Sequence, residues 1–96
     1  MKKVRLQIND REIALNEFVA SFVEAVVSGL VSNLIKGPAF GNAHVIITGP
    51  MVEIVVDNNS LQTNNFVQRI VRNTILGMAS SLKGEDTIEK LEVFMG

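Results

Sequence analysis

The sequence contains no cysteine, no tryptophan and no tyrosine, and it has a single histidine. Without cysteine there can be no disulfide, no thiolate metal site and no cysteine nucleophile. Charge is also sparse, because only 20% of the 96 residues are Asp, Glu, Lys or Arg, and the formal net charge is −1. Nucleic-acid binding normally depends on a basic surface or on stacking aromatic side chains. We therefore expect no nucleic-acid partner.

Apolar side chains are in excess and make up 47% of the residues. A chain of this length is expected to form one domain, here residues 1–96. Such a small domain buries roughly 60–65% of its unfolded surface, so this composition leaves apolar surface uncovered. A surplus of this kind is typical of a surface that is buried against another chain.

The longest apolar run, Phe18–Ile35, is long enough to suggest a membrane span. Glu24 and Asn33 lie inside the run, however, and both side chains are costly in lipid. A second run of the same spacing, residues 66–82, contains two arginines. We therefore predict two amphipathic helices, no membrane partner and a cytoplasmic protein.

The two runs lie 48 residues apart, which is half the length of the chain. A shift of 48 residues aligns nine pairs of identical residues. Most pairs are apolar, one pair is the two predicted helix caps, and one is a glycine inside each helix. The pairs are Val4/Val52, Asn16/Asn64, Phe18/Phe66, Val19/Val67, Val23/Val71, Gly29/Gly77, Ser32/Ser80, Leu34/Leu82 and Val45/Val93. We interpret the pattern as an internal duplication into residues 1–48 and 49–96. The alternative is that two amphipathic βαβ units resemble each other without common origin.

Periodicity and turn signals place the elements along the chain. Asn16 and Asn64 are good helix N-caps, and Lys36-Gly37 and Lys83-Gly84 are typical helix ends. Asn9-Asp10 is a turn, after which residues 11–15 can run back briefly. The predicted strands cover residues 3–8, 43–48, 51–56 and 88–95, and the predicted helices follow Asn16 and Asn64.

This βαββαβ order predicts an α+β sandwich with both helices on one face of the sheet. Right-handed crossovers and a tight connection at Gly49-Pro50 favour a four-stranded antiparallel sheet in the order 4-1-3-2. The arrangement resembles the ferredoxin-like superfold over the whole chain. No motif identifies a family within it, and a superfold does not imply a function.

Few residues carry chemistry. Arg5 and Glu53 are 48 residues apart, so we expect them to be neighbours on the two central strands and to form an ion pair on the open face of the sheet. The same face should carry Phe94 together with Ile46, Met51 and Val55. His44, the only histidine, has no partner at a recognisable catalytic spacing.

The ligand-binding candidates are Arg5, Glu53, His44 and Phe94. We predict no catalytic residue, no metal site and no cofactor.

Between its apolar residues, the first helix carries mostly small side chains rather than charged ones. Gly29 and Gly77 each reduce the stability of their helix by about 1 kcal/mol relative to Ala. Either the two glycines let the helices touch within one chain, or the first helix is a homodimer interface, which we favour. We therefore expect a non-enzymatic interaction or assembly module that works as a homo-oligomer. The alternative is a regulatory domain that binds a small molecule or peptide on the open sheet face or at a subunit interface. An enzyme using His44 or Arg5 has less support.

Overall fold

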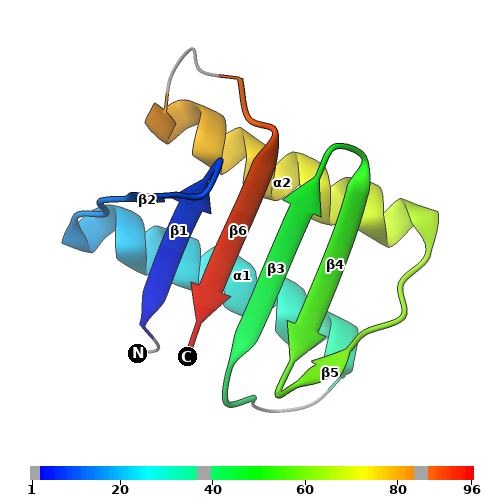
Figure 1. Cartoon of the computed structure of the whole chain (residues 1–96). Coiled ribbons are helices and arrows are strands. Elements are labelled where there is room, and N and C mark those ends of the chain that lie inside the picture. The colour runs from blue at the N-terminus through cyan, green and yellow to red at the C-terminus, as the bar shows by residue number, and fades with distance from the viewer. Residues whose placement is uncertain (1–2, 37–39, 84–86) are drawn as a thin grey trace.

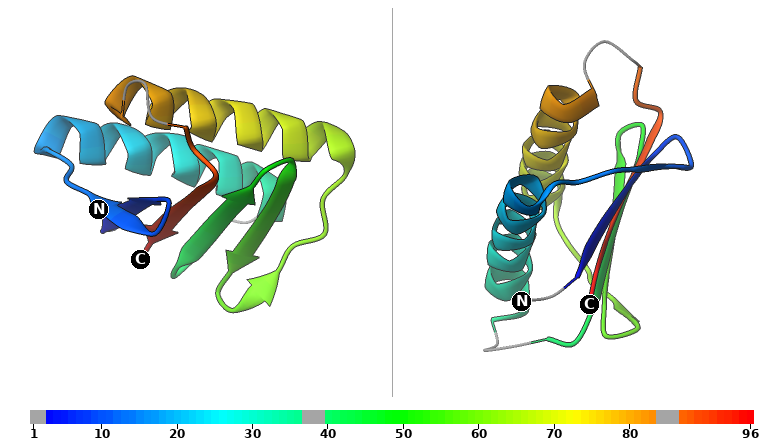
Figure 2. Two further views of the ribbon diagram at one scale, coloured as in Figure 1. Left: turned by 45° about the horizontal axis from the view of Figure 1, so that its top comes forward. Right: turned by 90° about the vertical axis from the view of Figure 1, so that its left-hand side faces the viewer.

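The computed structural model describes residues 3–36, 40–83 and 87–96, and in it two helices cover one face of a six-stranded antiparallel sheet (Figures 1 and 2). The strands are ordered β2-β1-β6-β3-β4-β5. The elements are β1 (Val4–Ile8), β2 (Arg11–Ile13), α1 (Glu17–Ile35), β3 (Ala43–Thr48), β4 (Met51–Val56), β5 (Asn59–Ser60), α2 (Asn65–Lys83) and β6 (Lys90–Met95).

The core lies between the sheet and the helices. Alternation in each strand turns one set of side chains inward, so that in β6 Leu91, Val93 and Met95 are at most 3% exposed. Each helix supplies three buried residues spaced four apart, which is the spacing of one helical face. They are Val23, Val27 and Val31 from α1, and Val71, Ile75 and Ala79 from α2.

The predicted sheet is wrong. The structure has six strands in one sheet, and not a duplicated four-stranded ferredoxin-like sheet of order 4-1-3-2. β6 lies in the centre of the sheet, where it pairs with β1 on one side and with β3 on the other. The mixed α+β composition and the placement of both helices on one face are as predicted.

Two short hairpins explain the different strand order. Asn9 and Asp10 have φ angles of 51° and 67°, and Asp57 and Asn58 have φ angles of 48° and 69°. Two consecutive positive φ angles are typical of tight hairpin turns, and these turns pair β1 with β2 and β4 with β5. In the predicted 4-1-3-2 order, β1 and β4 would be the two inner strands, and each would pair with a long strand on both edges. In the structure β2 occupies one edge of β1 and β5 occupies one edge of β4.

Several local predictions are confirmed. The Asn16 side chain accepts a 2.8 Å hydrogen bond from the Val19 amide, and Asn64 accepts one of 2.8 Å from Val67. Strands β3 and β4 form the expected antiparallel pair. α1 ends at Ile35, and its C-cap is Lys36, whose φ of 54° is left-handed and whose amide donates to the Ser32 carbonyl. The predicted helix ends at Gly37-Pro38 and Gly84 lie outside the described residues.

The two helices run antiparallel, side by side (Figure 1). The hypothesis that Gly29 and Gly77 let them touch is wrong, because a Cβ added at either glycine would meet no atom within 4 Å beyond its own helix backbone. Among the described residues, α1 is the one helix long and apolar enough to cross a membrane, by length and composition only. In this structure its buried valines pack against the sheet.

Candidate functional site

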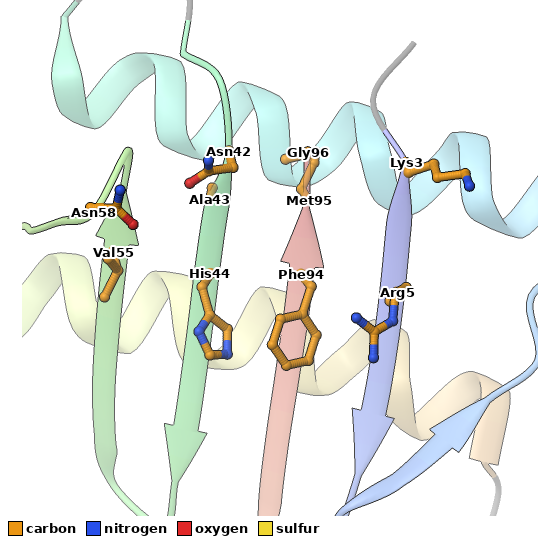
Figure 3. Close-up of a pocket in the computed structure, with 10 residues that line it drawn as sticks. All are labelled: Lys3, Arg5, Asn42, Ala43, His44, Val55, Asn58, Phe94, Met95 and Gly96. Atoms are coloured by element: carbon orange, nitrogen blue, oxygen red, sulfur yellow. The ribbon is translucent and has the colours of Figure 1, made fainter.

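The face of the sheet opposite the helices carries one continuous row of candidate residues. The strand register aligns Arg5 of β1 with Phe94 of β6, Phe94 with His44 of β3, and His44 with Val55 of β4. Figure 3 shows the side chains of Arg5, Phe94 and His44 next to one another across three strands. Three of the four predicted ligand-binding residues therefore come together on this open face.

Phe94 is at the centre of the row and contacts a ring on one side and a cation on the other. The His44 ring stacks on it with 4.2 Å between the ring centroids and an interplanar angle of 21°. The guanidinium carbon of Arg5 lies 4.9 Å from the centroid of Phe94, within the range of a cation–π contact. The two contacts hold the ring between β1 and β3.

Acidic side chains orient the polar members of the row. Glu12 Oε1 accepts from Arg5 Nη2 at 3.2 Å, and both side chains are about half exposed, at 53% and 54%. Glu92 Oε2 lies 2.9 Å from His44 Nε2, and the Glu92 side chain is only 12% exposed. Its other oxygen, Oε1, is 3.5 Å from Lys90 Nζ. Glu92 thus joins the row to the opposite end of the sheet.

Lys90 has a second acidic partner. Its Nζ donates to Asp10 Oδ1 at 3.3 Å. The hydrogen bond and charge of Asp10, together with the charge of Glu92, raise the pKa of Lys90 above its ordinary value of 10.5. The chain Asp10–Lys90–Glu92–His44 is therefore a connected polar network beside the row.

An open concavity of about 460 Å³ lies over this end of the sheet. Among the described residues, its walls include two cationic side chains, the stacked rings of His44 and Phe94 and several amide and apolar groups, but no acidic side chain. The lining residues are Lys3, Arg5, Asn42, Ala43, His44, Val55, Asn58, Phe94, Met95 and Gly96 (Figure 3). The side chains and charge suit a small anionic molecule with an apolar part.

The predicted ion pair between Arg5 and Glu53 is wrong. Arg5 lies on β1 and Glu53 on β4, and the sheet order places β6 and β3 between those strands. Glu53 aligns with Ile46 and is not among the residues that line the concavity. The prediction followed from the assumed 4-1-3-2 order and failed with it.

Sequence reasoning missed the two glutamates that hold the row. Glu92 lies two residues before Phe94 and therefore on the same face of β6, a signal that alternation alone could have supplied. Glu12 could not be found in this way, because its position depends on the β1–β2 hairpin. In the part of the chain that the structure describes, no group of three or more His, Asp or Glu could hold a metal ion.

The outer surface of the two helices is a second candidate site, which we call the helical face. Its large side chains are exposed although apolar: Phe18 is 74% exposed, Phe22 51% and Phe66 59%. Ile70 and Leu82 add exposures of 43% and 38%. An apolar surface of this size on one side of a small domain is typical of an interaction surface.

Comparison of this chain with known family models, curated proteins and solved structures finds no match.

Proposed function

We propose that the protein is a non-enzymatic interaction or assembly module that works as a homo-oligomer through its helical face. The observation that carries the proposal is the exposure of Phe18, Phe22 and Phe66 on the side of the helices that faces away from the sheet. Burying a phenylalanine side chain gains about 1.5–3 kcal/mol. Three such rings left in water would be a large cost for a domain of 96 residues.

Size-exclusion chromatography with multi-angle light scattering tests this proposal. We expect the wild type to have a mass above the 10.5 kDa of one chain at micromolar concentration. The double substitution Phe18→Ser/Phe22→Ser should reduce the mass to that of one chain. Met51→Ser is the matched control, because Met51 is 71% exposed but lies on the open sheet face. A single-chain mass for the wild type would rule out the proposal.

The open face supports a second candidate function, the binding of a small anionic ligand that regulates the module. The supporting observation is a concavity whose lining includes Lys3, Arg5 and the Phe94 ring without an acidic side chain. A carboxylate next to Arg5 would gain charge-assisted hydrogen bonds. An apolar group of the same molecule would lie over Val55.

Thermal unfolding in the presence of benzoate, a small aromatic carboxylate, tests the second candidate. Binding to the folded state raises Tm as the concentration of benzoate increases. The increase should disappear in Arg5→Gln and persist in Glu53→Gln, because Glu53 does not line the concavity. An equal shift in both variants would show that benzoate acts elsewhere.

A further inference from the structure

A polar stripe runs along the first half of α2, beside the apolar helical face. Its members are Asn65, Gln68, Arg69 and Arg72. The last three lie three, four and seven residues after the first, which places all four side chains on one side of the helix. Together with Pro50 they line a hollow of about 440 Å³, which we call the arginine hollow. Among the described residues, no acidic side chain lines it.

The arginine hollow lies where α2 passes the end of the β3–β4 hairpin (Figures 1 and 2). Gly49, whose φ is 57°, and Pro50 connect the two strands of this hairpin. The Nε of Arg72 donates to the Gly49 carbonyl at 2.8 Å. This bond holds the guanidinium of Arg72 against the turn and leaves the N–H donors of its two terminal nitrogens for another partner.

The two arginines of the hollow lack an anionic partner in the part of the chain that the structure describes. On the open sheet face, Arg5 and Lys90 each form an ion pair with a carboxylate. In contrast, no ion pair among the described residues includes Arg69 or Arg72. Like charges three residues apart on one side of a helix repel each other. An anion bound between the two guanidinium groups would remove this repulsion.

The amino-terminal end of α2 adds to the positive potential of the hollow. The first backbone amides of a helix point their N–H groups outward and favour negative charge. In α1, Glu17 meets this preference directly after the cap residue Asn16. In α2, Asn65 follows the cap residue Asn64, and the first turn has no acidic residue. The positive end of α2 therefore lacks the carboxylate that α1 has.

The donors that line the hollow suit a phosphate group. A phosphate monoester carries a charge of about −1.5 to −2 at pH 7 and three terminal oxygens that accept hydrogen bonds. The planar guanidinium of arginine can donate to two of these oxygens at once, so Arg69 and Arg72 can share one phosphate. The side-chain amide of Asn65 can donate to a further oxygen. A carboxylate has only two oxygens and a single charge, so it would satisfy the two arginines less completely.

The size of the hollow points to a ligand larger than phosphate itself. Its volume of about 440 Å³ lies within the range of about 300–1,000 Å³ that is typical of sites for small molecules. Pro50 contributes an apolar ring to the wall. A small carbon skeleton attached to the phosphate would therefore have a surface to pack on.

From these observations we infer that the arginine hollow binds the phosphate monoester group of a small molecule. Arg69 and Arg72 bind the phosphate oxygens, and the carbon skeleton packs on Pro50. The same group occurs in soluble metabolites and in lipid headgroups, and the experiment below distinguishes these sources. The inference is independent of the proposed function, because no described residue of the hollow belongs to the helical face or lines the concavity on the open sheet face.

NMR titration of the whole chain with methyl phosphate tests the site. We expect saturable chemical-shift changes at the side-chain Nε–H groups of Arg69 and Arg72. Arg69→Gln should raise the Kd for methyl phosphate by about 10-fold or more, because it removes one of the two charged donors. Arg11→Gln is the matched control: it changes the net charge equally, but Arg11 is exposed on β2, at the opposite edge of the sheet from β4 and β5. Its Kd should change by less than about 2-fold.

Arg69→Lys separates recognition of phosphate from attraction by charge alone. Lysine keeps the charge but cannot form the paired hydrogen bonds of a guanidinium. We expect its Kd to lie between those of the wild type and Arg69→Gln. A Kd equal to that of the wild type would overturn the inferred recognition of phosphate by paired bonds. Equal changes in Arg69→Gln and Arg11→Gln would overturn the site, because they would show an effect of overall charge.

Two further titrations define the ligand. Acetate should bind more weakly than methyl phosphate, and equal binding would overturn the assignment to phosphate. Co-sedimentation with vesicles that contain phosphatidic acid tests the lipid source. Sedimentation that is lost in Arg69→Gln and retained in Arg11→Gln would confirm the site and identify a lipid headgroup as its ligand. Binding of methyl phosphate without sedimentation would confirm a soluble ligand. The absence of both would overturn the inference and leave the proposed function untouched.

Discussion

Lys90 shows how a single residue of the open face responds to its neighbours. Its ammonium group is hydrogen-bonded to Asp10 and lies close to Glu92, and these partners raise its pKa above 10.5. A raised lysine pKa means that the folded state holds the proton more tightly than the unfolded chain does. The stabilisation is therefore fully present below pH 10.5 and is lost as the pH rises through the pKa of the folded state.

We predict that Asp10→Asn lowers the titration midpoint of Lys90, because the main cause of its raised pKa is removed. The measurement is the NMR chemical shift of the Lys90 side chain as a function of pH. Asp57→Asn is the control, because the Asp57 side chain accepts hydrogen bonds from the amides of Gly41 and Asn42, just before β3, and not from Lys90. A midpoint that is unchanged in Asp10→Asn would contradict the assignment of this cause.

Asn9 combines an unusual backbone conformation with three side-chain hydrogen bonds. Its φ is 51°, and its Oδ1 accepts from the amides of Glu89 and Lys90 at 2.8 and 3.0 Å. Its Nδ2 donates to the Thr87 carbonyl at 2.8 Å. One side chain therefore ties the β1–β2 turn to the segment that enters β6.

We predict that Asn9→Ala lowers the free energy of unfolding by about 2–4 kcal/mol. The substitution removes these hydrogen bonds, and it places an alanine at positive φ, where its Cβ is sterically unfavourable and no side-chain hydrogen bond offsets the cost. Asn9→Gly tolerates the φ angle and should lose less. Urea denaturation checks both. Asp57→Asn should cost less than about 1 kcal/mol, since an amide oxygen can still accept from Gly41 and Asn42. Equal losses in Asn9→Ala and Asn9→Gly would show that the backbone contribution is negligible.

At the scale of elements, the helices illustrate a conflict between intrinsic stability and assembly. Gly29 and Gly77 are poor helix formers, and nothing beyond their own helix fills the space above them in the part of the chain that the structure describes. Packing within the described part of the domain therefore does not account for glycine at these positions, whereas the proposed assembly would use the open space.

We predict that Gly29→Ala raises the free energy of unfolding of the monomeric fold by up to about 1 kcal/mol. The measurement is urea denaturation in the Phe18→Ser/Phe22→Ser background, where association does not contribute. Gly49→Ala is the matched control: the space around it is also open, but its φ of 57° should make the substitution destabilising. A loss of stability in Gly29→Ala would contradict the interpretation of an unfilled helix surface.

The sequence predicted individual elements better than their arrangement. Alternation identified the four long strands, and Asn16 and Asn64 marked the helix starts, because these signals depend on neighbours within a few residues. Strand order depends instead on which edges remain free. The three-residue β2 covers one edge of β1, and the two-residue β5 covers one edge of β4. Strands as short as these leave almost no periodic signal in the sequence.

The same reasoning separates the site residues that were found from those that were missed. Phe94 was correctly assigned to the open face from alternation within its own strand, and His44 lies two residues before Ile46, which was assigned to the same face. That they stack on each other follows from the β3–β6 pairing, which the 4-1-3-2 order did not contain. Glu53 was included only because of that order.

At the scale of the whole molecule, stability should be distributed from the centre of the sheet outward. β3 and β6 pair along six residues and have neighbours on both sides, whereas β2 and β5 are short edge strands. We predict that amides in β3 and β6 exchange hydrogen only through global unfolding and that those in β2 and β5 exchange through local opening. Native-state hydrogen exchange measured at increasing urea checks this, and equal protection of β5 and β6 would contradict it.

The central position of β6 also has a consequence for synthesis. A ribosome releases β1, β3 and β4 before β6, yet β1 and β3 have no direct pairing and are joined only through β6. Until β6 emerges, the nascent chain can form the β1–β2 and β3–β4 hairpins, but β1 and β3 each have one unpaired edge. The final cooperative step is then the insertion of one strand between two others, so the domain completes its sheet only after β6 has emerged.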